Sequence, residues 1–200
     1  MKLNKVLALA LSGVMAVSML AGCSGNPGNG GQGGEGEQTP ATGIVAVTNE
    51  EQKDNKVNVP FEYSAELEDD LTLAVQVKGQ AATGGDIATQ LSTIMNVTNN
   101  GFSGLSGTSS NHAAWVGTTT AIRVVKVDGN VIESVAMKNA AKNVSADLKN
   151  LIDEYKVSDI VYKYGFDGDV AMISVDTVDG GVLYYVAYVV TCNTTKALAD

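Results

Sequence analysis

Residues 24–43 restrict the fold of this chain more than any other segment, because they cannot contribute to a hydrophobic core. Eight of these twenty residues are Gly, and the segment has no large apolar side chain. Such a composition gives a flexible coil. The sequence therefore predicts a tether over residues 23–43 and one folded domain over residues 44–200, with its core between residues 56 and 192,.

The residues before this tether are apolar and have a basic start. Lys2 and Lys5 precede the apolar run Val6–Leu20, which leads into Leu20-Ala21-Gly22-Cys23. The run is shorter than the roughly 20 residues that span a bilayer. The pattern resembles the signal peptide of bacterial lipoproteins. The resemblance implies that residues 1–22 are cleaved, that Cys23 carries a lipid, and that this lipid holds the chain at the extracytoplasmic face of the cell membrane.

The charge of the chain excludes one class of partner. The net charge is −9, and removal of residues 1–22 takes away two lysines and no acid, which leaves −11. The single arginine is Arg123. Nucleic-acid binding needs clustered Lys and Arg, so we expect no nucleic-acid partner, and we expect membrane contact through the lipid on Cys23.

Hydrophobic periodicity predicts an α+β domain with the element order ββαββαβββ. A mostly antiparallel sheet with two helices on one face is expected. Asp86 is predicted to be the N-cap of the first helix and Ser145 the N-cap of the second,. The predicted strands are Val57–Tyr63, Leu71–Val77, Ile122–Val127, Val131–Met137, Asp159–Tyr164, Asp169–Val178 and Val182–Cys192, with hairpin turns at Asp128-Gly129 and at residues 179–181.

A long uncharged segment is the candidate ligand-binding loop. Residues 87–122 contain no Asp, Glu, Lys or Arg, and their second half is rich in Gly, Ser, Thr and Asn. The candidate ligand-binding residues are Phe102, His112 and Trp115. Phe102 and Trp115 offer apolar surfaces, while the polar neighbours suit a glycan, a peptide or another small neutral ligand. The alternative is that Trp115 only anchors the loop to the core.

His112 is the single histidine and gives rise to an enzymatic alternative, a small hydrolase that uses His112 with a loop serine,. The nearby sequence Gly101-Phe102-Ser103-Gly104-Leu105 lacks the final glycine of a nucleophile elbow,. We therefore expect no catalytic residue, and a surface histidine without a role.

Metal and cofactor sites have little support in the sequence. Asp167 and Asp169 could offer oxygen ligands to calcium, but Asp and Gly are also common in turns,. Residues 79–84 have the glycine spacing of a phosphate loop without its Lys,. Cys192 is expected to be a buried thiol, and no cofactor is predicted.

Six of the seven tyrosines lie between Tyr155 and Tyr188, which suggests either cross-strand pairs or an exposed strip,. The leading hypothesis is a lipid-anchored domain that binds a partner protein, a cell-wall component or a small neutral ligand. The alternatives are the hydrolase and a structural or assembly lipoprotein of the cell envelope that uses the tyrosine strip.

Overall fold

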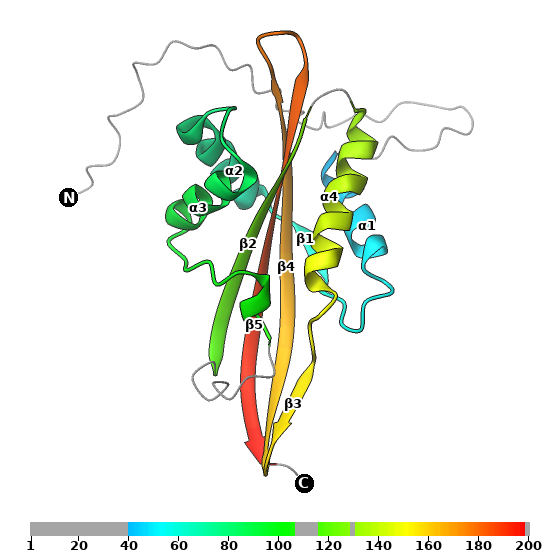
Figure 1. Ribbon diagram of the computed structural model, residues 1–200, viewed down its shortest axis with the longest axis vertical. Helices are drawn as coiled ribbons and strands as arrows, with labels where there is room; N and C mark the ends of the chain where they lie inside the picture. The colour runs from blue at the N-terminus through cyan, green and yellow to red at the C-terminus, as the bar shows by residue number, and fades with distance from the viewer. Residues whose placement is uncertain (1–39, 107–115, 129–130, 199–200) are drawn as a thin grey trace, which may run out of the picture.

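Two long strands form the centre of the molecule. In the computed structural model, which describes residues 40–106, 116–128 and 131–198, β4 (Ile160–Asp176) and β5 (Val182–Leu198) pair antiparallel along their full length. The sheet order is β1-β4-β5-β2, with β3 also beside β4 (Figure 1). Its other strands are β2 (Gly117–Val127, antiparallel to β5), β1 (Phe61–Tyr63, parallel to β4) and β3 (Glu154–Val157, antiparallel to β4).

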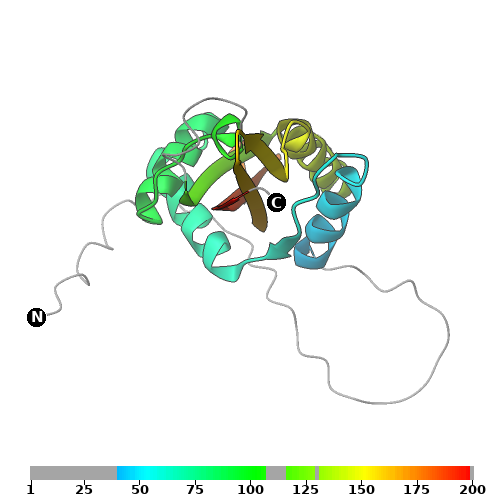
Figure 2. The same ribbon diagram turned by 90° about the horizontal axis from the view of Figure 1, so that it is seen from below.

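Helices cover both faces of this sheet in pairs. α1 (Pro40–Glu51) and α4 (Glu133–Leu148) pack on one face, and α2 (Ala65–Lys78) and α3 (Gly84–Ile94) pack on the other. Figure 2 shows the two pairs on opposite sides of the strands. The short 3₁₀ helix η1 (Phe102–Gly104) contacts β2 and α4.

The predicted α+β class is confirmed, and the sheet is mostly antiparallel, because β1–β4 is the one parallel pair among the described strands. The predicted element order and the placing of two helices on one face are wrong. The described α-helices and strands follow the order αβααβαβββ, with two helices on each face. Val170 and Met172 of β4 face α1 and α4, while Ala171 and Ile173 face α2 and α3, so both faces are apolar and need cover,.

The strand predicted at Leu71–Val77 is part of helix α2. Its alternating apolar residues also fit a helix, since Leu67, Leu71 and Val75 follow one another at a spacing of four and are all buried,. Ser64 caps the helix by accepting a hydrogen bond from the Leu67 amide at 3.2 Å,. Val77 lies on the other side of α2 and is exposed.

The hairpin predicted at Asp128-Gly129 is also wrong, because Val131–Met137 leads into and begins helix α4. Ala136, Ala140 and Val144 are fully buried at a helical spacing of four. Ser145 lies near the end of this helix and does not begin one, and its hydroxyl donates to the Glu51 carbonyl at 2.8 Å.

β4 is one continuous strand across the region predicted as two strands. The sequence Asp167-Gly168-Asp169 suggests a turn, but Gly168 is a site of close packing. A Cβ at this position would lie 2.6 Å from the Phe61 ring and 2.9 Å from Val59. The predicted turn at residues 179–181 is confirmed, with Thr177 N donating to the Gly181 carbonyl at 2.8 Å.

Side-chain amides of α1 cover the β1 edge of the sheet. Asn49 donates to the Phe61 carbonyl at 3.1 Å and accepts from the Phe61 amide at 3.0 Å. Gln52 makes the same pair of hydrogen bonds with Val59. α1 begins at Pro40 and buries Ile44, so the helix extends into the segment predicted as a tether.

Within residues 40–106, 116–128 and 131–198, no helix combines the length and the apolar composition needed to cross a bilayer.

Candidate functional site

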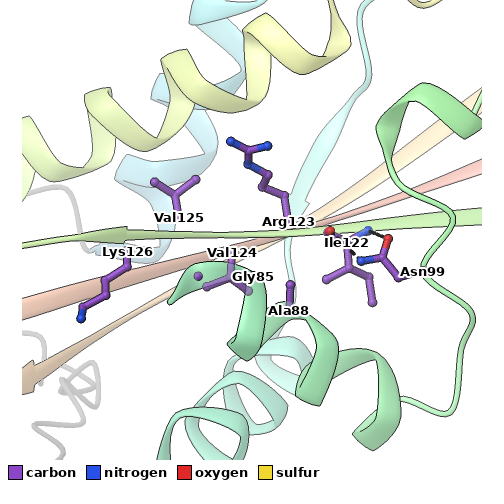
Figure 3. A pocket seen from close by; sticks show the side chains of 9 residues that line it. Gly85, Ala88, Asn99, Ile122, Arg123, Val124, Val125 and Lys126 are labelled. Atoms are coloured by element: carbon purple, nitrogen blue, oxygen red, sulfur yellow. Dashed lines mark hydrogen bonds between the residues drawn. The ribbon is translucent and has the colours of Figure 1, made fainter. Parts of the chain in front are cut away.

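A groove of about 490 Å³ lies between α3 and the outer edge of β2 (Figure 3). Three small residues of α3 form one wall, the loop after α3 closes one end, and β2 forms the floor. The lining residues are Gly84, Gly85, Ala88, Asn99, Ile122, Arg123, Val124, Val125 and Lys126.

The first turn of α3 reaches the β2 edge because it begins with two glycines. A Cβ at Gly84 would lie 2.2 Å from the Val124 carbonyl oxygen, so only glycine fits there without a shift of the backbone. At Gly85 the nearest atom would be the Thr83 hydroxyl oxygen at 3.7 Å. Gly85 therefore has room for a side chain beside the groove.

A capping box fixes the start of α3. Thr83 is the N-cap, and its hydroxyl oxygen accepts from the Asp86 amide at 3.2 Å. The Asp86 carboxylate accepts in return from the Thr83 amide at 3.0 Å,. The hydrogen bonds from the Thr83 hydroxyl and amide lower the pKa of Asp86. The prediction that Asp86 itself caps the helix is wrong, since it lies three residues after the cap.

Asn99 holds the loop after α3 against β2. Its Nδ2 donates to the Ile122 carbonyl at 3.0 Å, and its Oδ1 accepts from the Ile122 amide at 2.9 Å. The next amide, that of Asn100, donates to the Thr120 carbonyl at 2.9 Å. These bonds occupy part of the open edge of β2, so the groove is a bounded hollow and not a free strand edge.

Two cations of β2 line the groove and point to opposite faces of the sheet (Figure 3). Arg123 Nη1 lies 3.0 Å from Asp147 Oδ2 of α4. This buried Asp147 oxygen has no hydrogen-bond partner among the described residues. Arg123 and Asp147 therefore form an ion pair whose geometry does not meet that of a hydrogen bond. Burial raises the pKa of Asp147, and the charge of Arg123 opposes this rise.

Lys126 is held at the other face by a hydrogen bond to the Gln80 carbonyl at 2.7 Å and lies 3.9 Å from Asp128. No Asp or Glu is among the residues that line the groove. The charged residues of the lining are therefore both cations, which suits a ligand with hydrogen-bond acceptors,.

Two smaller hollows on the described residues differ from the groove in charge. One, of about 180 Å³, is lined by Glu66, Asp70 and Asp169 without a cation. Burial and neighbouring acids raise the pKa of both Asp70 and Asp169. The other, of about 420 Å³, lies beside Glu50, Glu51 and Lys138. The groove is thus the one hollow of the three whose lining carries cations and no acid.

Of the residues predicted for ligand binding, Phe102 is the one that the structure describes. Cys23, His112 and Trp115 lie outside the described residues. Phe102 is half-buried on η1, packs against the core between the sheet and α1 and α4, and is not among the residues that line the groove. The hydrolase alternative depends on His112, so it stays a prediction.

Asp167 and Asp169 lie two residues apart on one face of β4, and both are exposed. The described residues contain no group of three or more His, Cys, Asp or Glu side chains placed to hold a metal ion. Cys192 is fully buried, and burial raises the pKa of its thiol.

The tyrosines do not form an exposed strip. Tyr162, Tyr164, Tyr185 and Tyr188 are buried in the core. Phe61 contacts Tyr188 edge-to-face, with ring centroids 5.6 Å apart. The exposed surface proposed for an assembly role is therefore absent at these four positions.

The sequence did not predict the groove. Gly84 ends the segment that has phosphate-loop spacing, and Gly85 follows it. Two glycines after a Thr cap signal a helix start that lies close to another backbone. The sequence does not reveal which strand supplies that backbone. Searches against known protein families, curated proteins and solved structures found no match to this chain.

Proposed function

We propose that this chain is a lipid-anchored, extracytoplasmic binding domain that holds a polar, acceptor-rich ligand in the groove between α3 and β2. The observation that carries the proposal is the lining of the groove, which combines Asn99, Arg123 and Lys126 with no carboxylate. The segment that ends at Cys23 supports the anchor, because it resembles a lipoprotein signal peptide,.

The groove fits a ligand better than it fits an added strand. Asn99 and Asn100 already bind the edge of β2 at Ile122 and Thr120, and Gly84 lies against the Val124 carbonyl. A glycan or a folded-back peptide segment of a partner, whose carbonyl and hydroxyl oxygens accept hydrogen bonds, matches a lining that carries two cations and no carboxylate,.

Mass spectrometry of the chain purified from the membranes of its own host tests both parts of the proposal. We expect the denatured mass to show loss of residues 1–22 and addition of lipid. We expect the native mass to exceed the denatured mass by that of a bound ligand. An unmodified N-terminus contradicts the anchor, and equal native and denatured masses contradict the binding role.

Gly85 variants connect the bound mass to the groove. Gly85→Glu places a carboxylate in the groove, while the loss of a glycine and the gain of an acid in the first turn both favour helix α3. We expect Gly85→Glu to lose the bound mass and the matched variant Gly85→Ala to retain it. Retention of the ligand by Gly85→Glu places the ligand elsewhere.

A further inference from the structure

Among the described residues, no helix lies over part of one face of the sheet. α2 and α3 pack against Ala171, Ile173 and Val175 of β4, whereas Lys163, Gly165 and Asp167 on the same side of that strand are exposed. Figure 1 shows β4 and β5 extending well below α2 and α3. We call this area the open face and define it as residues 161–169 of β4 with their partners 189–197 of β5, on the side of α2 and α3. Val189, at the end next to α2, is buried.

The charges on the open face are separated along the strands. Asp167 and Asp169 lie toward α2, and Glu62 of β1 lies directly across from Asp169. Lys163 lies toward the opposite end, and Lys156 of β3 lies directly across from Val161. Residues that pair across strands share a face of the sheet, so these charged side chains belong to one surface.

The two ends carry opposite charge overall. The α2 end has three carboxylates, and the far end has two lysines and one acid, Glu154, which lies across from Lys163. Among the described residues, no ion pair within 4.0 Å involves Glu62, Lys156, Lys163, Asp167 or Asp169. Their charges are therefore available to a partner.

The centre of the open face carries no charge. Gly165 of β4 pairs with Asn193 of β5, and Asn193 Oδ1 accepts from the Thr118 hydroxyl of β2 at 2.9 Å. Gly165 has no side chain, so another surface can approach closely there.

The register makes this surface self-complementary. Consider two copies whose open faces meet across a two-fold axis that runs parallel to the Gly165–Asn193 row and perpendicular to the strands. Position 167 of one copy then faces position 163 of the second copy, and position 169 faces position 161. Because Glu62 pairs with Asp169 and Lys156 pairs with Val161, the same axis brings Glu62 onto Lys156. On β5 it brings Thr191 onto Thr195, and Asn193 meets its own copy,.

We propose that the open face binds the open face of a second copy of this chain, with Asp167 and Glu62 of each copy facing Lys163 and Lys156 of the partner subunit. Burial and the neighbouring Glu62 and Asp167 charges raise the pKa of Asp169 in the single chain. Cations from a second copy relieve that repulsion.

The buried area that the open face can supply indicates how stable the dimer is. With β2 on one side and the short strands β1 and β3 on the other, nine residues at about 3.3 Å each and four rows of strands at about 4.8 Å each give at most roughly 30 by 19 Å, or about 1,100 Å² from the two copies together,. Stable interfaces bury about 1,200–2,000 Å². The dimer is therefore weak and is favoured when many copies share one membrane surface.

Thiol cross-linking of the full chain in host membranes tests the dimer. Stacked sheets lie about 10 Å apart. In the proposed dimer the two Asn193→Cys thiols face each other on the axis, so a short bis-maleimide should join them. Val178→Cys, fully exposed at the β4–β5 turn, is the matched control, and the native Cys192 is buried. We expect at least tenfold more cross-linked dimer from Asn193→Cys than from Val178→Cys.

Charge reversal in the Asn193→Cys background gives the decisive comparison. Lys156→Glu with Lys163→Glu, or Glu62→Lys with Asp167→Lys, should each reduce the dimer at least tenfold, and all four changes in one chain should restore it. The restored variant also shows that these exposed positions tolerate substitution. Equal yields from all variants, failure of the four changes to restore the dimer, or cross-links to a different protein each overturn the proposal.

Discussion

At the residue scale, glycines mark close contacts between elements. Gly84 brings α3 against the Val124 carbonyl, and Gly168 lets Phe61 and Val59 pack onto β4. Both glycines lie in sequences that favour turns or loops when judged locally. Their spatial neighbours come from distant parts of the chain, so the sequence alone does not distinguish packing from turning.

Gly168→Ala should destabilise the domain. The added Cβ would lie 2.6 Å from the Phe61 ring and 2.9 Å from Val59 Cγ1, in a buried region of the core. Overpacking of this kind costs about 1–3 kcal/mol. Gly165→Ala on the same strand is the control, since its nearest neighbour would be 3.9 Å away. Urea unfolding measures both free energies, and equal values for the two variants contradict the packing role of Gly168.

At the element scale, α1 stabilises the sheet through its amide side chains as well as its apolar face. Gln52 is buried and bonds both the amide and the carbonyl of Val59, and Thr48 Oγ1 lies 3.4 Å from the Tyr188 hydroxyl. Such buried polar groups hold a helix in one register on the sheet edge.

Gln52→Leu should destabilise the domain although the side-chain volume is similar. The variant leaves the amide and the carbonyl of Val59 without their partner, and each buried group left unsatisfied costs about 1–3 kcal/mol. Gln76→Leu makes the same change at an exposed position of α2 and should have little effect. The free energy of unfolding in urea separates the two variants. A loss no larger for Gln52→Leu than for Gln76→Leu contradicts the role of the amide.

The sequence predicted elements well where local signals were unambiguous. Helix α3 with its polar start, strand β5 and the turn at residues 179–181 are all present. Most of α2 and the start of α4 were predicted as strands, because runs such as Leu71–Val77 satisfy both periods and burial against a partner face decides between them. The groove was not predicted, because it requires the register between the start of α3 and β2.

At the scale of the whole molecule, folding places several carboxylates of this acidic chain in partly buried positions, some of them beside other acids. Glu68, Asp70, Asp147 and Asp169 come from α2, α4 and β4, and burial is the largest cause of the raised pKa of each. For Asp70 and Asp169 neighbouring acids add to the rise. Self-repulsion at a net charge of −9 acts in the same direction,.

These raised pKa values predict that the domain is more stable at pH 5 than at pH 7. A carboxyl with a raised pKa binds a proton more tightly in the folded state than in the unfolded state. Its contribution to the stability of the fold is therefore present at pH values near the unfolded-state pKa and is lost as pH rises through the folded-state pKa. Asp86 and Asp179 have lowered pKa values, so their stabilisation is lost only below about pH 4 and does not offset the trend,. Thermal unfolding followed by circular dichroism should give a higher Tm at pH 5, and Asp169→Asn should reduce the difference because it removes one of the titrating groups. A Tm that is equal at the two pH values, or higher at pH 7, shows that the clustered carboxylates do not control the pH dependence of this fold.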